Sequence, residues 1–259
     1  MSDQRVHLNL IDSSRQLFEL DPDAVLEIGE GWTFGAGSCS HPSISNAAFR
    51  SDDSLEADEF VARAKNFFAR RGRGFSIWAR VDQPEDRDLF AAAEQAGLQH
   101  VYEMPEMILK APVEALPLPS GAEVRRLTSE EQADDYWHIA AAAYASLDFP
   151  PEVFQGYTDH RGLLADNLVA FIAYLDGDPV SIAMTIVNHG VAGIYWVGSL
   201  EQARGKGLGR ATTAAATNAG FELGADIASL QASPMGRPIY EEMGYETVFA
   251  YKLLMSPPA

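Results

Sequence analysis

The chain has 259 residues and a hydrophobic fraction of 47%, which suits a globular protein with room for one large domain or two ordinary ones. Its net charge of −18 argues against nucleic acid as a partner, because phosphates would be repelled, and would attract a cationic amine. No apolar run approaches the ~20 residues of a membrane span, no signal peptide is evident, and one cysteine, Cys39, allows no internal disulfide. We therefore expect a cytoplasmic protein without a membrane partner.

The first half of the chain predicts alternating strands and helices. The helix expected over 55–71 has apolar residues at helical spacing, an acidic start and a basic end, which suits the helix dipole. Pro105 cannot donate a main-chain hydrogen bond, so the last strand is expected at an edge or with a bulge. The expected elements are strands at 25–28 and 32–36, a helix at 55–71, a strand at 75–81, a helix at 87–96 and a strand at 101–109.

Residues 111–120 contain three prolines and are the best linker candidate. They divide the chain into two predicted units, residues 1–110 and residues 121–259. In the second unit, Ser129 is expected to cap a helix. The expected elements are a strand at 122–127, helices at 129–145 and from about 151, strands at 168–175, 179–187 and 194–200, a helix at 211–223, a strand at 226–231, a helix at 239–243 and a strand at 247–254.

The stretch 194–223 combines an apolar strand, a basic glycine-rich turn and an Ala/Thr-rich helix. Glycines at alternate positions let main-chain N–H groups converge, because no Cβ blocks the approach. The helix N-terminus adds partial positive charge, and Arg204, Lys206 and Arg210 add full charges. The turn therefore predicts an anion site of pyrophosphate size. It fits neither the P-loop nor the Rossmann fingerprint, whose required residues fall on the wrong positions.

The spacing that does fit is Arg/Gln-x-x-Gly-x-Gly/Ala, carried by Arg204, Gly207 and Gly209. It resembles the acetyl-CoA loop of the GNAT superfamily of N-acetyltransferases. The resemblance extends over roughly residues 121–255 and is also strong over 233–245, SPMGRPIYEEMGY. It implies an α/β (α+β) fold with a mixed, mostly antiparallel sheet flanked by helices. It also implies acetyl-CoA as the co-substrate, and an amine that receives the acetyl group.

The resemblance further implies roles for individual residues. Main-chain groups on the central strand would pair with the pantetheine arm and polarise the thioester carbonyl. Tyr240 would be the catalytic acid that protonates the departing thiolate, although a tyrosine that only packs its helix is the alternative. Ser233 departs from the asparagine of many relatives, so its role is open. The implied coenzyme-binding residues are Val197, Gly198, Ser199, Arg204, Gly205, Lys206, Gly207, Leu208, Gly209, Arg210 and Ser233.

The sequence does not identify a general base. The two positions where many relatives have a glutamate hold Ile194 and Ala228. Glu201, His189, Asp148 and a water chain remain as candidates, but each of the three side chains is better explained as a surface residue than as a base. No two His or Cys residues have metal-ligand spacing, so we predict no metal.

Contacts to the acceptor are expected from 147–157, which resembles the variable loop between the first two GNAT helices. Tyr195 and Trp196 are expected on the central strand, where alternation would send one side chain to each face. One of them could line the acceptor site, and core packing is the alternative for both.

The end of the first half echoes the end of the second, with Gly97 matching Gly244 and Val101 matching Val248. No Arg-x-x-Gly-x-Gly precedes the first half's long helix, where acidic residues would repel a pyrophosphate. We interpret the chain as a tandem GNAT with a degenerate first copy. Residues 1–110 are then predicted to bind no acetyl-CoA and to form a scaffold or a wall of the substrate cleft. The alternative is two unrelated α/β segments with similar endings.

The sequence thus predicts an acetyl-CoA-dependent N-acetyltransferase, an acyltransferase that acts by direct transfer on a small-molecule amine or an N-terminal amine. A non-catalytic acyl-CoA-binding regulator is the alternative, because no carboxylate base is evident. Transfer of a longer acyl chain is a third hypothesis. The sequence leaves a homodimer open.

Overall fold

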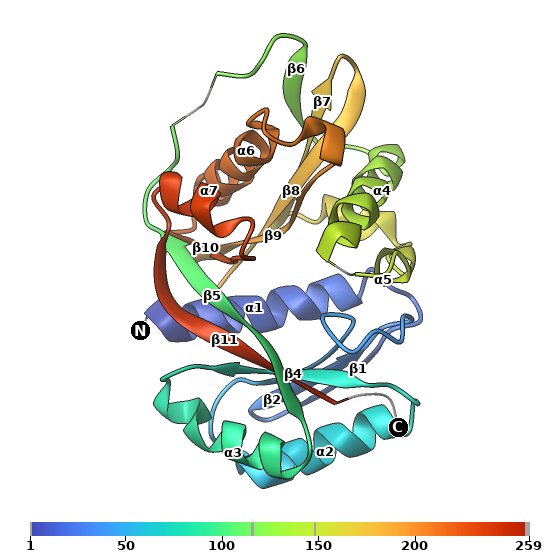
Figure 1. Ribbon diagram of the computed structural model, residues 1–259, viewed down its shortest axis with the longest axis vertical. Coiled ribbons are helices and arrows are strands. Elements are labelled where there is room, and N and C mark those ends of the chain that lie inside the picture. The colour runs from blue at the N-terminus through green and yellow to red at the C-terminus, as the bar shows by residue number, and fades with distance from the viewer. Residues whose placement is uncertain (1, 115–116, 148, 257–259) are drawn as a thin grey trace.

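The computed structural model describes residues 2–114, 117–147 and 149–256. Over these residues the chain forms an 11-stranded, mostly antiparallel sheet with helices against it, which confirms the predicted fold class. The first half lies at the bottom of Figure 1 and most of the second half at the top, with the N-terminal helix between them. No helix in this described part is long and apolar enough to cross a membrane.

The predicted helices and strands of the first half are confirmed, with small shifts at their ends. Two elements were not predicted, an amphipathic N-terminal helix and a five-residue strand at Asn46–Arg50. The elements are α1 (Ser2–Phe18), β1 (Val25–Gly29), β2 (Trp32–Ala36), β3 (Asn46–Arg50), α2 (Ala57–Ala69), β4 (Phe75–Arg80), α3 (Arg87–Gln95) and β5 (Gln99–Leu109).

The second half follows the predicted order. Ser129 does not cap its first helix through its side chain; instead the Gln132 side chain accepts hydrogen bonds from the N–H groups of Thr128 and Ser129. The elements are β6 (Ala122–Arg126), α4 (Glu131–Tyr144), α5 (Glu152–Gln155), β7 (Leu168–Leu175), β8 (Asp178–Asn188), β9 (Val191–Ser199), α6 (Leu208–Glu222), β10 (Ile227–Gln231), α7 (Arg237–Glu242) and β11 (Glu246–Ser256).

The last strands of the two halves are exchanged. The strand order is β1-β2-β3-β4-β11-β5-β10-β9-β8-β7-β6. Strand β11 of the second half therefore pairs with β4 and β5, and β5 of the first half pairs with β11 and β10, all antiparallel. Figure 1 shows β5 and β11 side by side between the two layers of helices. Each half also contains one parallel pair, β3 with β4 and β9 with β10.

Pro105 does not lie in an edge strand, because β5 has a neighbour on each side. The carbonyl of Pro105 accepts a hydrogen bond from Ala232, just beyond the end of β10. A residue's N–H and C=O point to the same side of an antiparallel strand. The position where Pro105 lacks an N–H therefore faces the chain just beyond the end of β10. No hydrogen bond within the β5–β10 pair is lost there, so the proline is tolerated. A bulge was the other expectation for this strand. An irregularity does occur beside it, because the register of β11 against β5 shifts between Thr247 and Phe249.

Helix α1 joins the two halves through buried polar side chains. Asn9 donates from Nδ2 to the carbonyl of Ile186 in β8 at 3.2 Å. His7 bonds the hydroxyl of Tyr251 in β11 at 2.9 Å and the carbonyl of Arg50 in β3 at 2.8 Å. Asn9 and His7 are both fully buried, so these bonds replace lost hydration and fix the position of α1.

Candidate functional site

The glycine-rich turn leads directly into α6, as the sequence predicts. Gly205 and Gly207 have φ angles of +73° and +77°, in the left-handed region that glycine adopts without a Cβ penalty. Leu208 begins the helix and is fully buried beneath the turn. The first N–H groups of a helix have no intrahelical acceptor and carry partial positive charge. The turn therefore presents main-chain donors suited to an anion.

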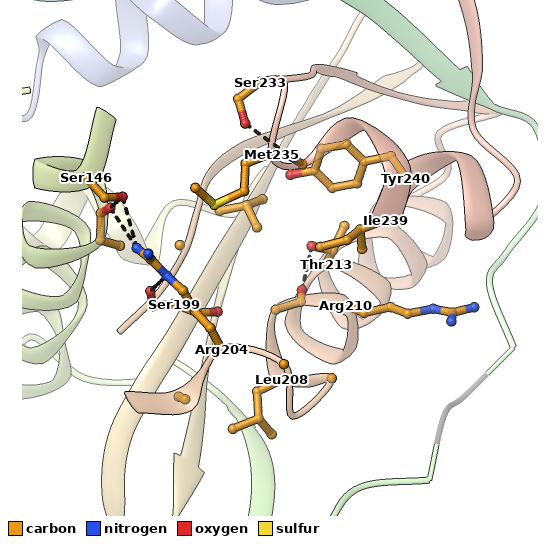
Figure 2. A pocket seen from close by; sticks show the side chains of 18 of the residues that line it. Ser146, Ser199, Arg204, Leu208, Arg210, Thr213, Ser233, Met235, Ile239 and Tyr240 are labelled. Carbon is orange, nitrogen blue, oxygen red and sulfur yellow. Dashed lines mark hydrogen bonds between the residues drawn. The ribbon is translucent and has the colours of Figure 1, made fainter. Parts of the chain in front are cut away.

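A cavity of about 570 Å³ lies beside this turn, between α4, β9, α6 and α7. Figure 2 shows Ser146 and Arg204 on one side of it and Tyr240 on the other. Lys206 is exposed and is not among the described residues that line the cavity. The other predicted residues all line it, namely Val197, Gly198, Ser199, Arg204, Gly205, Gly207, Leu208, Gly209, Arg210, Ser233 and Tyr240. Their individual roles remain predictions.

Strands β9 and β10 separate beside the cavity. Their parallel pairing runs from Val191 and Ile227 to Gly193 and Ser229, while β9 continues to residue 199. Beyond Gly193, the main-chain groups on that side of β9 have no β10 partner. This separation opens the main chain of residues 197–199 to a ligand, which is the arrangement needed for pairing with an extended arm.

A bulge in β9 changes the direction of its side chains. Met184 pairs with Tyr195 and Ile182 with Gly198, so two residues of β9 lie opposite one of β8. Trp196, within the bulge, has φ of +49°, a strained conformation for a residue with a Cβ. The alternation expected for Tyr195 and Trp196 is therefore wrong. Both side chains belong to the same buried cluster and line the same second cavity.

The two arginines of the turn already have protein partners. Arg204 donates to the Ser146 hydroxyl at 2.9 Å and to the Ser199 carbonyl at 3.4 Å, so it ties the end of α4 to the end of β9. Arg210 forms an ion pair of 3.5 Å with Glu242. Its Nε is buried and has no hydrogen-bond partner among the described residues. Arg210 thus retains an unused donor at the cavity wall.

Tyr240 lies in α7 and is 9% exposed. Its ring packs over Gly236, where an added Cβ would come within 2.8 Å of the ring. The Gly236 N–H donates to the Ser233 hydroxyl at 3.1 Å, so Ser233 helps to begin α7. Burial raises the pKa of Tyr240 to about 12. Within the described residues its hydroxyl has no hydrogen-bond partner, so a neutral phenol faces the cavity.

Neither of the two proposed bases that the structure describes lies at the cavity. His189 lies in the turn before β9 and bonds Asp12 at 2.6 Å; the ten residues to Ser199 correspond to roughly 30 Å of strand. Glu201 is exposed and outside the lining, and Asp148 lies outside the described residues. No group of three metal-ligating side chains occurs in the part of the chain that the structure describes.

Glu106, which was not among the residues predicted from sequence, is fully buried in β5. Its Oε2 accepts a hydrogen bond of 2.6 Å from Gln231 in β10, and its Oε1 has no partner within the described ranges. Burial raises the pKa of this carboxyl to about 8. Gln231 lines the second cavity. The sequence signal was a glutamate within an apolar strand, but its neighbours depend on the strand exchange.

Replacing Glu106 with Gln should flatten the dependence of stability on pH. A carboxyl whose pKa rises from 4.5 to about 8 on folding contributes full stability below pH 4.5 and loses it as the pH rises towards 8. The loss is on the order of 4 kcal/mol. Urea unfolding of wild type and Glu106→Gln between pH 5 and 8 measures it. A wild-type stability that stays constant over this range would contradict the burial of an ionisable carboxyl.

A second cavity, of about 350 Å³, adjoins the first and is lined by both halves. Within 147–157, which was expected to contact the acceptor, Phe149 lines this cavity. Val153, Phe154 and Tyr157 instead pack in the buried cluster around Trp196. Contact between this loop and the acceptor stays a prediction, and Phe149 is the described residue of the loop that is placed to make it.

Comparison with known proteins finds similarity to acetyltransferases, with the family match in the second half. The family described as Acetyltransferase (GNAT) domain matches residues 118–233. A mycothiol acetyltransferase of Thermomonospora curvata is 26% identical over 73% of this chain and 66% of its own length. One of Cellulomonas flavigena is 28% identical over 55% of this chain and 45% of its own length. The chain therefore matches about two thirds of the first relative and less than half of the second.

Solved structures agree in fold along the whole chain. A GCN5-related N-acetyltransferase from Kribbella flavida has a TM-score of 0.75 at 20% identity, covering 99% of this chain and 96% of its own. A tandem GNAT protein from the clavulanic acid biosynthesis pathway has a TM-score of 0.61 at 13% identity, covering 97% and 96%. The second half therefore resembles a GNAT acetyltransferase domain over residues 118–233, and the solved structures extend the likeness in fold to the rest of the chain.

Proposed function

We propose that the protein transfers an acetyl group from acetyl-CoA directly to a primary amine, either of a small molecule or of a chain N-terminus. The observation that carries this proposal is the cavity between the N-terminus of α6, the open end of β9 and the phenol of Tyr240. It combines donors for an anion, exposed main chain for an extended arm and one neutral acid. Acetyltransfer from a coenzyme thioester uses all three.

The residues present suit the coenzyme. Gly209 approaches β9 so closely that an added Cβ would lie 3.0 Å from the Ser199 hydroxyl, so a larger residue would narrow the cavity. The N–H groups at the start of α6 and the unused Nε of Arg210 can serve the pyrophosphate. We propose residues 197–199 for the pantetheine arm, because β10 leaves that side of β9 unpaired.

In the proposed reaction the neutral amine attacks the thioester carbonyl carbon and a C–N bond forms. The oxyanion is stabilised by a main-chain N–H of β9. Collapse breaks the C–S bond, and the departing thiolate takes the proton of the Tyr240 hydroxyl. The surplus proton of the amine passes to water, and the Tyr240 phenolate then regains a proton from solvent. Atoms and charge therefore balance in a reaction that needs no carboxylate base.

A coenzyme-binding regulator without catalysis is the second candidate. It is favoured because neither Glu201 nor His189 lines the cavity, and the carboxylate that does, Glu242, is paired with Arg210. Release of free coenzyme thiol separates the two functions. Amine-dependent thiol release supports the transferase. Tight acetyl-CoA binding with no release across a broad amine panel would support the regulator. Competition between acetyl-CoA and longer acyl-CoAs decides whether a longer chain is transferred.

Gly207→Ala should weaken coenzyme binding about tenfold, because a side chain at this left-handed φ costs about 1–2 kcal/mol and shifts the N–H groups that begin α6. Gly177→Ala is the matched control. Gly177 also has a left-handed φ, and neither glycine has an atom within 4 Å of an added Cβ. Calorimetry should show weaker CoA binding for the first variant alone. Equal affinities, or tight binding of ATP or NAD in place of CoA, would refute the assignment.

A further inference from the structure

The second cavity lies where the two halves meet. Leu17 of α1, Phe49 of β3 and Trp78 of β4 come from the first half, while β9 and β10 contribute from the second. Its volume of about 350 Å³ lies within the range of small-molecule sites. The residues shared with the coenzyme cavity are Tyr144, Val197, Ser233 and Tyr240. The two cavities therefore adjoin at the proposed acid.

We propose that this cavity binds the acceptor, and that the acceptor is a small primary amine carried on an aromatic or aliphatic body. The inference rests on the proposed acetyl transfer and names the class of molecule that accepts the group. It also gives the first half a direct part in substrate choice, because that half supplies much of the wall.

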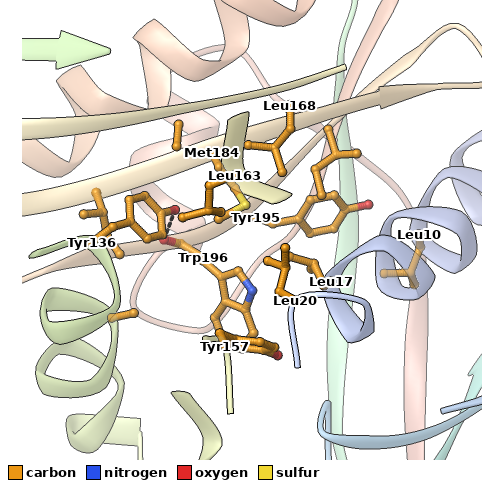
Figure 3. Packing of buried hydrophobic residues seen from close by; sticks show 14 of the residues in the cluster. Leu10, Leu17, Leu20, Tyr136, Tyr157, Leu163, Leu168, Met184, Tyr195 and Trp196 are labelled. Carbon is orange, nitrogen blue, oxygen red and sulfur yellow. Dashed lines mark hydrogen bonds between the residues drawn. The ribbon is translucent and has the colours of Figure 1, made fainter. Parts of the chain in front are cut away.

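The walls are mainly rings and aliphatic chains. Figure 3 shows Leu10 and Leu17 of α1 facing the region of Tyr195 and Trp196 in β9. The Tyr195 hydroxyl donates to Asn9 at 2.7 Å, and the Trp78 indole N–H donates to a serine hydroxyl at 3.1 Å. The Tyr195 hydroxyl and the Trp78 indole N–H thus both donate to protein acceptors, so these two side chains present mainly apolar surface to the cavity.

Charge in the lining excludes acidic acceptors. Glu103 is the one charged side chain among the described lining residues, and it is exposed. A phosphate or carboxylate on the acceptor would enter without a cationic partner and would lose its hydration. An ammonium group, by contrast, is attracted by Glu103 and by the protein's net charge of −18.

An apolar cavity also helps to supply the neutral nucleophile. An alkylamine with a pKa near 10.4 is neutral in only about one molecule in 2,500 at pH 7. Burial disfavours the charged form and lowers the pKa of the amine. Glu103 would attract the ammonium at the rim, and the apolar interior would favour loss of its proton to water. The cavity thus performs part of the task of the missing base.

Three amines of matched design test the class. 2-Phenylethylamine and phenylalanine share a ring and an amine and differ by one carboxylate, while glucosamine carries its amine on a polar ring. We expect kcat/KM for 2-phenylethylamine, measured by thiol release, to exceed both others at least tenfold. Equal or greater values for phenylalanine or glucosamine would overturn the inference and leave acetyl transfer intact. Failure to bind acetyl-CoA, or to acetylate any amine, would instead overturn the proposed function.

Two variants locate the site. Phe149→Ala removes a partly exposed ring from the wall and should raise KM for 2-phenylethylamine about tenfold, with KM for acetyl-CoA unchanged. Glu103→Gln should raise KM for the amine severalfold at low salt, with the difference shrinking as salt screens the charge. Glu94→Gln, an exposed residue of α3 outside the cavity, should change neither value. Unaltered amine KM in both cavity variants would place the acceptor elsewhere.

Discussion

Tyr240→Phe is expected to lower kcat about 100-fold, within the range typical of general acid catalysis, while coenzyme affinity stays the same. The substitution removes a hydroxyl that has no hydrogen-bond partner among the described residues and keeps the ring that packs over Gly236. The fold and the cavity wall are therefore preserved. Rapid-mixing kinetics with acetyl-CoA, together with calorimetric titration of CoA, measure the two quantities separately.

The pKa of Tyr240 bears on this role in two ways. At about 12, the phenol remains protonated throughout the working pH range, so the acid is always present. An ordinary thiol has a pKa near 8.5, which makes proton transfer from such a phenol uphill by about 5 kcal/mol in water. A thiolate formed in the same buried site is also poorly solvated, and its own pKa rises. Burial thus raises the pKa of the phenol and that of the thiol, and the difference between the two pKa values becomes smaller.

Tyr245→Phe provides the matched control. Tyr245 is also buried, and its ring lies 6.1 Å from that of Tyr240, but its hydroxyl bonds Thr217 at 2.7 Å and does not line the cavity. This variant should lose some stability and keep its kcat. We also expect no alkaline fall in kcat up to about pH 10 from ionisation of Tyr240. Full activity in Tyr240→Phe would remove this residue from the mechanism.

The glycine-rich turn and its place at the start of α6 could be predicted from sequence because its conformation is determined locally. Arg204, Gly207 and Gly209 lie within six residues, and the conformation of such a turn depends mainly on its own glycines. The following helix and the preceding strand have their own periodicity. A short stretch thus contains most of the information needed to place an anion site, although it does not show that Lys206 lies outside the cavity lining.

The second cavity could not be predicted, because it depends on contacts between distant segments. Phe49 and Gln231 line one cavity although 182 residues separate them in the chain. The surroundings of Glu106 could not be predicted either, because its partner Gln231 lies on β10, which β5 meets only through the strand exchange. The bulge at Trp196 also reversed an expectation based on simple alternation. A shift of one residue in strand register moves the following side chains to the other face of the sheet. The sequence pattern does not show where such a bulge occurs.

Expression of residues 1–110 and 121–259 as separate chains is expected to yield no folded monomer of either segment. The predicted division at residues 111–120 would leave β11 without β4 and β5, both of its neighbours. Tyr251, Leu253 and Leu254 are fully buried in β11, and burial of each such side chain contributes about 1.5–3 kcal/mol. Their combined contribution approaches the total stability of an ordinary domain, about 5–15 kcal/mol.

The intact protein provides the control for this experiment. Cleavage at a protease site inserted within residues 111–120 should leave the two fragments associated and folded, because the exchanged strands and α1 hold them together. Size-exclusion chromatography and thermal unfolding compare the cleaved protein with the separate chains. A monomeric segment 121–259 that unfolds cooperatively and binds CoA would show that the exchange is dispensable. Loss of both properties in the separate chain, with retention after cleavage, would mean that the first half completes the catalytic sheet.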